Sequence, residues 1–425
     1  MDNWNIETKL IQCGYQPKSG EPRVVPITQS TTYKYDTCAE VAALFDLESV
    51  GHMYSRISNP TVSAFEEKMT ALENGVTAVA TASGQTASML SILNVCSSGQ
   101  SFIATSNLYG GTANLFTHTM KNFGVEVIYV DQNASLEELL SHVKENTRAI
   151  FAESLANPAM DVLDFDKFSK FAKTAGIPLI VDNTFPTPFL CNPIDLGAHI
   201  VVHSSTKYID GHATSVGGVI IDGGKFDWNK YSEKFPGLTT PDKSYHGLIY
   251  TEAFGNMAYG IKVRTQLIRD TGAYMSPMNA FLSNNGLETL HLRMERHCKN
   301  AQKIAEFLAT NDKISWIKYP GLAGDENYNA AKKYLKGCSG VFTFGVKGGA
   351  EAGEKFMNAL NIFAIVVHVA DLRSSVLHPA SMTHRQLDEQ EQLAAGVTPD
   401  LIRMSVGLEN ADDLIADIEQ ALAQI

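Results

Sequence analysis

The sequence predicts an α/β protein with a mostly parallel sheet in a large domain and a smaller α+β domain at the C-terminal end. Strand and helix patterns alternate from residue 61 to residue 221, which favours parallel strands with helices on both faces. Two short apolar runs, 178–181 and 199–202, are bounded by turn residues and are therefore expected to be buried strands. The chain has 425 residues, 44% hydrophobic and 19% charged, which is enough to bury a large core.

Charge and composition exclude several classes of partner. The formal net charge is −12, whereas nucleic acids and anionic membranes attract basic surfaces. The six cysteines form no CxxC pair and no metal-ligand spacing, as is typical of reduced thiols in a cytosolic protein. The first residues show no signal-peptide pattern, and no apolar run approaches the ~20 residues that span a bilayer. We therefore expect a cytoplasmic protein without a membrane or nucleic-acid partner.

Three segments are expected along the chain. Residues 1–60 are rich in Pro, Thr and Tyr and lack a periodic pattern, so they are expected to form an extended arm that a compact monomer has little reason to keep. Residues 61–275 are expected to form the large domain and residues 276–425 the small one. Within the arm, Tyr54 and Arg56 are flanked by turn formers, a pattern that suits a surface turn as well as a functional site.

Each element of the large domain follows from its apolar pattern and from the turn formers beside it. The expected helices are 61–73, which ends at Asn74-Gly75, 86–95, one that opens at 108–111, and 164–175, which ends at Gly176. The expected strands are 76–80, 102–105, 125–130, 148–153, 178–181, 199–202 and 216–221. Residues 223–276 show no clear period and are expected to form a long functional loop region beside the site.

The small domain is expected to contain a mixed sheet. A long helical stretch, 279–309, leads into it. Further elements are expected at 316–319, 329–335, 341–346, 352–360, 363–367 and 401–406, followed by a closing helix from residue 411. His378 and His384 lack other ligand-like neighbours, so we interpret them as loop and packing residues and not as metal ligands.

The turn 82–85 is a candidate anion site. It contains Ser83, Gly84 and Gln85 and joins a predicted strand to a predicted helix, whose first N–H groups and dipole attract negative charge. The GxGxxG and Walker A patterns are both absent, so a single phosphate fits better than a dinucleotide or a nucleoside triphosphate. A tight turn that simply needs small residues remains an alternative.

An acid and a lysine end two neighbouring strands. Asp182 follows the first apolar run and Lys207 the second, and ligands of open α/β sheets bind beyond the carboxyl ends of the strands. Lysine amines form Schiff bases with carbonyl compounds. The hydroxyls of Ser204 and Thr206 suit a phosphate, and a buried carboxylate suits a protonated ring nitrogen. This set meets the needs of pyridoxal 5′-phosphate (PLP), although a solvated strand-end lysine is the ordinary alternative.

Two further residues stand out. Tyr109 lies at a strand end, where its ring could stack on a flat cofactor or pack as a core tyrosine. Arg403 lies in an apolar run, where a charge is costly unless it is paired. It is therefore either a carboxylate clamp or part of an internal salt bridge.

These signals occur together in one order that resembles the PLP-dependent enzymes of cysteine and methionine metabolism. The resemblance runs from about residue 7 to the end of the chain. The motifs that carry it are Tyr54-Ser55-Arg56, Ser83-Gly84-Gln85, Leu108-Tyr109-Gly110-Gly111, Asp182-Asn183-Thr184, Ser204-Ser205-Thr206-Lys207-Tyr208, the segment 378–384 and Arg403-Met404-Ser405-Val406-Gly407. The segment His368-Val369-Ala370-Asp371-Leu372-Arg373 departs from the Ser-Leu-Gly-Gly or Asn-Leu-Gly-Asp of much of the family, at a place where contacts to the substrate carboxylate are expected.

The resemblance implies a fold-type I PLP-dependent transferase and a role for each motif residue. Lys207 would bind PLP covalently and shuttle protons, Asp182 would keep the pyridine nitrogen protonated, and Tyr109 would stack on the ring. Arg403 would hold the substrate α-carboxylate, and Tyr54 would also contact the substrate. The remaining cofactor contacts would come from Ser83, Gly84, Gln85, Asn157, Ser204 and Thr206, and from Tyr54 and Arg56 of a neighbouring subunit in a homotetramer built from two dimers.

The resemblance also implies an activity. The resemblance is strongest to the members that replace the acetoxy group of O-acetyl-L-homoserine with sulfide. The segments that carry this closer resemblance are 110–116, 255–272 and 284–290. Cystathionine γ-synthesis and methionine γ-elimination are the alternatives within the family, and a cysteine in place of Gly111 would favour the elimination. A non-catalytic PLP-binding scaffold is the alternative outside enzymes, against which Lys207, Asp182 and Arg403 together argue.

Overall fold

The computed structural model describes residues 4–383, 385, 392 and 396–425. Its larger sheet has seven strands in the order β1-β7-β6-β5-β4-β2-β3. Strand β7 is antiparallel to both of its neighbours, and the other neighbouring pairs are parallel. The strands are β1 Thr77–Thr81, β2 Ser101–Thr105, β3 Glu126–Val130, β4 Thr147–Glu153, β5 Leu179–Asp182, β6 Ile200–His203 and β7 Gly218–Asp222. The mostly parallel sheet predicted from the sequence is confirmed.

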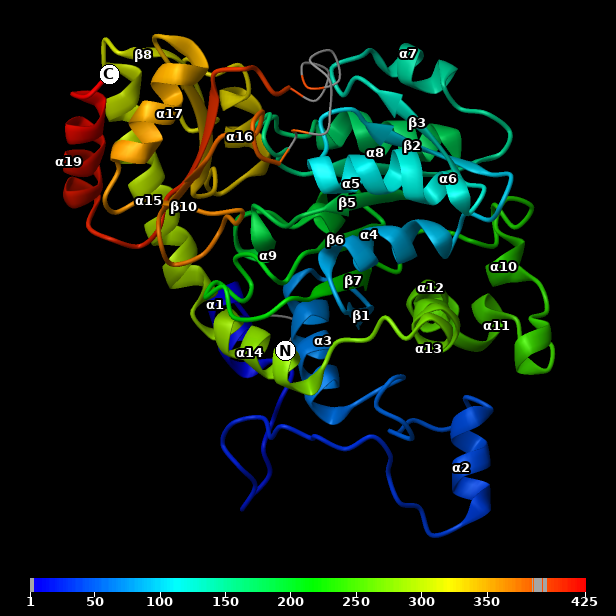
Figure 1. The fold of residues 1–425 in the computed structure, drawn as a ribbon. Coiled ribbons are helices and arrows are strands. Elements are labelled where there is room, and N and C mark those ends of the chain that lie inside the picture. The colour runs from blue at the N-terminus through cyan, green and yellow to red at the C-terminus, as the bar shows by residue number, and fades with distance from the viewer. Residues whose placement is uncertain (1–3, 384, 386–391, 393–395) are drawn as a thin grey trace.

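Helices cover the larger sheet on both faces, with α4 and α5 in front of it and α8 behind it in Figure 1. Helix α8 shows why the sequence folds this way locally. Asp164 caps its first turn, Phe165, Phe168 and Phe171 are buried along one face, and Gly176 ends it in the left-handed conformation. The helices of this part are α3 Pro60–Leu72, α4 Gly84–Leu93, α5 Gly110–Asn114, α6 Met120–Asn122, α7 Leu136–Ser141, α8 Phe165–Ala175 and α9 Thr187–Leu190.

A second sheet of five strands forms near the C-terminus, in the order β10-β11-β12-β9-β8. Only the β10–β11 pair is parallel, so the sheet is mixed as predicted. Helices α15 and α19 pack against one another beside it, and a separate apolar core fills the space between them and the strands. The elements are α14 Pro277–Glu288, α15 Leu290–Ala309, β8 Ile314–Lys318, α16 Tyr328–Tyr334, β9 Val341–Val346, α17 Gly349–Ala359, β10 Ala364–Ile365, β11 Ser375–Leu377, β12 Leu401–Ser405 and α19 Ala411–Leu422.

The prediction of a long loop region at 223–276 was wrong. This stretch contains several short helices and a π-helical turn, and none of its residues lines the cavity described below. Buried polar residues hide the helical period: Lys262 donates to the backbone and side chain of Asn94, and Arg264 pairs with Glu66. The elements are α10 Pro236–Thr239, α11 Tyr250–Phe254, α12 Ala258–Lys262, the π-helix Val263–Ile268 and α13 Arg269–Thr271, with single 3-10 turns at Lys243–Tyr245 and Gly255–Met257.

Two smaller predictions also need correction. The helical stretch predicted at 279–309 is interrupted at Thr289, so that α14 and α15 are separate helices. The element predicted at 363–367 is reduced to the two residues of β10, which are exposed.

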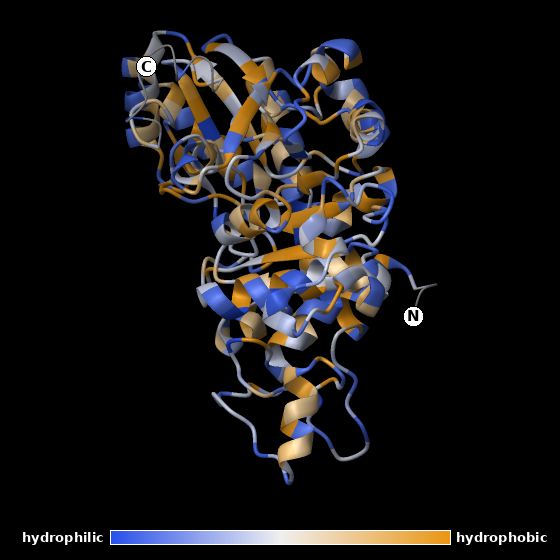
Figure 2. Ribbon diagram, turned by 90° about the vertical axis from the view of Figure 1, so that its right-hand side faces the viewer, coloured by the Kyte–Doolittle hydropathy of each residue, from blue (hydrophilic) through white to orange (hydrophobic). Residues whose placement is uncertain are grey.

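The N-terminal arm is irregular apart from the short helices α1 Ile6–Gln12 and α2 Cys38–Phe45. Figure 1 shows the part around α2 projecting below the body of the molecule, and Figure 2 shows this helix as largely hydrophobic. Phe45 is 57% exposed, and Val50 just after the helix is fully exposed. The boundaries at residues 60 and 275 stay predictions. No described helix is long and apolar enough to cross a membrane.

Candidate active site

A cavity of about 240 Å³ lies at the carboxyl ends of strands β4, β5 and β6. It brings together ten of the residues singled out in the sequence: Ser83, Gly84, Gln85, Tyr109, Asn157, Asp182, Ser204, Thr206, Lys207 and Arg403. Arg403 reaches it from β12 of the second sheet, so the cavity lies between the two sheets. Tyr54 and Arg56 do not line it.

Lys207 follows strand β6 and is largely buried in the cavity. Its Nζ lies 3.3 Å from Nδ1 of His368, and it forms no ion pair with a described residue. Burial, and then the charge of Arg403, lower the pKa of Lys207 to about 8. An amine with a lowered pKa is a better nucleophile and base near neutral pH.

Asp182 ends strand β5 and is held by the residue two positions later. The backbone N–H and the hydroxyl of Thr184 donate to Oδ1 of Asp182 at 2.9 and 2.5 Å, and the same hydroxyl accepts the N–H of Ser204. Burial raises the pKa of Asp182, and the hydrogen bonds from Thr184 oppose this change. Among the described residues Asp182 forms no ion pair, and a carboxylate of this kind is suited to a protonated ring nitrogen.

Glu153 is a second buried acid that the sequence reading did not single out. It lies opposite Asp182 in the register of β4 and β5, and it lines the cavity. Its carboxylate accepts the backbone N–H groups of Tyr109 at 2.6 Å and of Asn157 at 3.1 Å. Burial, and then the neighbouring Asp182, raise the pKa of Glu153 well above its usual range. Glu153 therefore fixes the two loops that carry Tyr109 and Asn157.

The turn before α4 packs tightly against the end of β6. A Cβ atom on Gly84 would lie 2.5 Å from Cβ of Ser204, so only glycine allows this approach. Ser83 caps α4 by accepting the N–H of Thr86. The N-terminus of a ten-residue helix thus faces the hydroxyl-bearing strand end, which is the arrangement of an anion site.

Tyr109 and Gln85 line the cavity beside the first turns of α4 and α5. The side chain of Gln85 donates to the carbonyl of Gly111 at 2.8 Å and accepts from the hydroxyl of Thr112, so it joins the start of α4 to the start of α5. The ring of Tyr109 is 43% exposed and lies over Gly111, where a Cβ atom would be 2.6 Å from it.

Arg403 is buried, and its guanidinium has few hydrogen-bond partners among the described residues to offset the loss of water. Its Nη1 donates to the side-chain oxygen of Asn157 at 3.3 Å, and its buried Nε has no partner among the described residues. It forms no salt bridge with any carboxylate of the described part of the chain, which argues against the internal ion pair considered from the sequence. Burial lowers the pKa of Arg403 to about 10.

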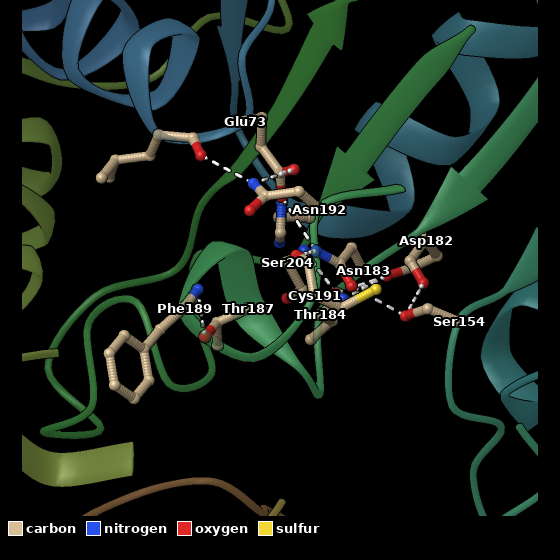
Figure 3. Close-up of polar contacts among 12 residues, drawn as sticks. Glu73, Ser154, Asp182, Asn183, Thr184, Thr187, Phe189, Cys191, Asn192 and Ser204 are labelled. Carbon is tan, nitrogen blue, oxygen red and sulfur yellow. Dashed lines mark hydrogen bonds and ion pairs between the residues drawn. The ribbon is translucent and has the colours of Figure 1, made fainter. Parts of the chain in front are cut away.

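A buried polar network holds the residues beside the carboxyl ends of β5 and β6 (Figure 3). Glu73, fully buried at the end of α3, accepts from the side-chain amide of Asn183 at 2.9 Å and contacts Nε2 of His203 at 2.7 Å. The hydroxyl of Ser154 donates to the side-chain oxygen of Asn183. Asn183 follows Asp182 and His203 precedes Ser204, so the network fixes the positions of two cavity residues through their neighbours.

The residues present fit PLP. A helix N-terminus beside two hydroxyl-bearing residues suits its phosphate, the buried Asp182 suits its ring nitrogen, and the amine of Lys207 suits its aldehyde. Arg403 lines the same cavity and has no carboxylate partner among the described residues, so an anionic group of a substrate would supply its missing counter-charge.

Tyr54 and Arg56 lie together on the arm. The guanidinium of Arg56 lies 5.2 Å from the centre of the Tyr54 ring, and its Nη1 donates to the carbonyl of Arg269. The Tyr54 side chain is 41% exposed. Within one chain, therefore, neither residue serves the cavity.

Sequence reasoning missed Glu73, Glu153 and Thr184 as parts of the site. Glu153 could have been found from the sequence, because it ends the predicted strand that precedes the strand leading to Asp182. His378, expected to be a packing residue, donates from Nε2 to the carbonyl of Pro399, and its Nδ1 contacts the hydroxyl of Ser381. His384 lies outside the described residues.

Comparisons with known proteins agree with this geometry. Residues 7–423 match the family described as Cys/Met metabolism PLP-dependent enzymes. An O-acetyl-L-homoserine sulfhydrylase from Leptospira meyeri is 47% identical over 100% of this chain and 98% of its own. A homocysteine synthase from Schizosaccharomyces pombe is 44% identical over 99% of both chains.

A solved structure shares the fold over almost the whole chain. It is a putative O-acetylhomoserine (thiol)-lyase from Campylobacter jejuni, crystallised with a pyridoxyl-lysine phosphate in its chain, and it is 38% identical with a TM-score of 0.95 over 99% of this chain and 100% of its own. With a match over nearly the full length to the family, to its curated members and to a solved member, this chain belongs to the PLP-dependent enzymes of cysteine and methionine metabolism.

Proposed function

We propose that the chain catalyses γ-replacement on O-acetyl-L-homoserine: the C–O bond at Cγ breaks, a C–S bond to sulfide forms, and L-homocysteine and acetate result. Full-length relatives are named for this activity. The observation that carries the proposal is one buried cavity that contains an amine, a ring-nitrogen partner and an unpaired guanidinium, contributed by Lys207, Asp182 and Arg403.

The geometry supports a role for each of these residues. Bound PLP supplies an electron sink for the charge left when the α-proton is removed. Lys207 takes that proton, because its amine is buried and its pKa is lowered to about 8. Asp182 holds the proton on the ring nitrogen, and Arg403 binds the α-carboxylate through its planar fork of donors.

The walls of the cavity orient the cofactor. Ser83, Gly84 and Gln85 at the start of α4 bind the phosphate together with Ser204 and Thr206, whose hydroxyl also contacts the backbone of Gly217. Tyr109 would stack on the ring of bound PLP, and Asn157, which is fixed by Glu153 and Arg403, would hold its phenolic oxygen.

The same cavity bears on the alternatives within the family. A side chain at position 111 would meet the ring of Tyr109 at 2.6 Å and displace it. The close approach of Gly111 and Tyr109 thus disfavours a cysteine-assisted elimination here, and we rank methionine γ-elimination and cystathionine γ-synthesis below sulfhydrylation.

Product analysis tests the proposal. With O-acetyl-L-homoserine and sulfide, methanethiol or cysteine offered separately, we expect homocysteine from sulfide as the fastest reaction, and little release of methanethiol from methionine alone. Borohydride reduction should fix the pyridoxyl group on Lys207, and Lys207→Ala should retain PLP through the phosphate contacts but lose turnover. Fixation on another lysine, or faster consumption of methionine than of O-acetylhomoserine, would refute the proposal.

We further propose that the chain is a cytoplasmic homotetramer of two dimers, in which the arm of one subunit completes the cavity of its partner. Three observations support the role of the arm in a partner's cavity: Tyr54 and Arg56 lie outside their own cavity, the arm projects from the body (Figure 1), and its apolar residues Phe45 and Val50 are exposed. Exposed apolar surface of this kind is typical of an interface.

A further inference from the structure

The imidazole of His368 contacts the amine of Lys207, and nothing in the reaction described above uses it. His368 precedes strand β11 in the segment that departs from the family pattern, and it lines the cavity. Its Nδ1 lies 3.3 Å from Nζ of Lys207. Its Nε2 is buried and has no hydrogen-bond partner among the described residues.

His378, in the same domain, has no contact with the cavity amine. Both ring nitrogens of His378 have partners within the protein, the hydroxyl of Ser381 and the carbonyl of Pro399, each at 2.8 Å. Buried polar atoms are normally satisfied in this way. Single unsatisfied ring nitrogens also occur on His203, His291 and His297, none of which lines the cavity. The feature that sets His368 apart is the contact of its Nδ1 with the amine of Lys207 inside the cavity.

The charge state of His368 fixes the direction of its hydrogen bond. Burial, and then Lys207, lower its pKa to about 4, while Asp371 and Asp210 act in the opposite direction and Arg403 adds to the lowering. At neutral pH the ring is uncharged, so only one nitrogen carries a proton. Because the ammonium form of Lys207 has only donors, Nδ1 is the acceptor of this contact and Nε2 carries the proton.

An acceptor at this position matters for a lysine that must act as a base. A neutral amine has two N–H groups and one lone pair, and it rotates freely about its last bond. If one N–H donates to Nδ1, the lone pair cannot be directed to His368 and remains available for the α-proton of the substrate. A protonated imidazole would do the opposite, because it would compete for that lone pair.

We propose that His368 is a positioning residue for Lys207: it holds the amine whenever the amine is not covalently bound to the cofactor, and so presents its lone pair to PLP or to the substrate. The proposal rests on the proposed function only in that Lys207 is the base. It does not depend on which amino acid is the substrate.

Two substitutions of His368 separate the effect of its hydrogen-bond acceptor from the effect of the volume of its ring. His368→Asn keeps an acceptor oxygen near the place of Nδ1 in a smaller side chain, and His368→Phe keeps a ring without an acceptor. Ile365→Ala, on the same segment but 42% exposed and outside the cavity, is the matched control.

The first measurement needs no turnover. Full-length apoenzyme is mixed with PLP, and the rate of covalent bond formation at Lys207 is followed by its absorbance, with borohydride fixation and peptide mass as the check on the site. The second measurement is kcat, KM and the isotope effect of an α-deuterated substrate in the holoenzyme.

His368→Phe should slow both covalent bond formation and kcat by about 10- to 100-fold, the usual effect of a misplaced catalytic group. KM should change little, and the deuterium isotope effect should rise because proton removal becomes slower. His368→Asn should recover most of the loss, and Ile365→Ala should match the wild type.

The proposal is overturned if His368→Phe binds Lys207 to PLP at the wild-type rate, or if His368→Asn is as slow as His368→Phe, which would indicate packing alone. If the wild-type enzyme does not turn over O-acetylhomoserine, the proposed substrate fails. The apoenzyme rates still decide the role of His368.

Discussion

Arg403 shows how a single residue joins folding to binding. The residue is 6% exposed, its guanidinium has one weak contact to Asn157, and it has no carboxylate partner in the described part of the chain. Burying a cation without an anion is unfavourable. A bound carboxylate would supply the missing anion, so substrate binding relieves a cost that the folded protein already carries.

Arg403→Lys should therefore weaken binding of the amino-acid substrate by about 2–5 kcal/mol, because an ammonium cannot make the bidentate contact. PLP absorbance should persist. Burial lowers the pKa of Lys207 to about 8 in this cavity. The pKa of the amine introduced by Arg403→Lys should be lowered in the same way. A group with a lowered pKa loses its charge as the pH rises, so the variant should bind substrate still more weakly at alkaline pH.

Substrate titrations followed by PLP absorbance at several pH values would measure both effects. Arg296→Lys, at an exposed position of α15 outside the cavity, is the control. Unchanged affinity in Arg403→Lys would show that this arginine is a structural residue.

Among the elements, the contact between the start of α4 and the end of β6 shapes the proposed phosphate site. Gly84 has no Cβ, and the space that a Cβ would need is filled by Ser204, with its Cβ at 2.5 Å and its backbone Cα at 2.8 Å. Because a backbone atom cannot rotate away, any side chain at position 84 must push the helix from the strand. The anion site depends on this close approach.

Gly84→Ala should lower the affinity for PLP by about 10-fold or more, since a displacement near 1 Å is enough to impair a positioned group. Equilibrium dialysis of the apoenzyme against PLP would measure this. Gly324→Ala, where a Cβ atom would meet nothing within 4 Å, should bind PLP normally. Equal affinity in the two variants would place the phosphate elsewhere.

The same elements show what the sequence could predict. Lys207, Asp182 and the turn 82–85 were found because each ends a strand with a strong apolar pattern, and parallel strands end at one edge of the sheet. Residues 223–276 were misjudged because Lys262 and Arg264 are polar residues with partners inside the protein. Glu73 gave no signal at all, since its partners Asn183 and His203 are 110 and 130 positions away.

At the scale of the whole molecule, the separation of the arm from its own cavity makes a claim about mixed dimers. If Arg56 of one subunit serves the PLP held by Lys207 of the other, Arg56→Ala and Lys207→Ala homomers should each be nearly inactive. In a heterodimer of the two variants, one site receives both intact residues and the other receives neither.

Co-expression with two different affinity tags would isolate these heterodimers, and their activity should rise well above that of either parent. Mixing the same tags on Lys207→Ala and on a double variant with both substitutions provides the control, since no intact site can form there. Heterodimers as inactive as their parents would mean that both residues act within one chain or that Arg56 takes no part.

The position of β12 in the middle of the second sheet has a consequence for folding during synthesis. This strand, Leu401–Ser405, pairs with both β11 and β9 and contributes Arg403 to the cavity. A ribosome completes all seven strands of the first sheet long before it reaches β12, and domains fold in the order in which they emerge. The emerging chain can therefore assemble the proposed cofactor site before it gains Arg403, the residue proposed to hold the amino acid.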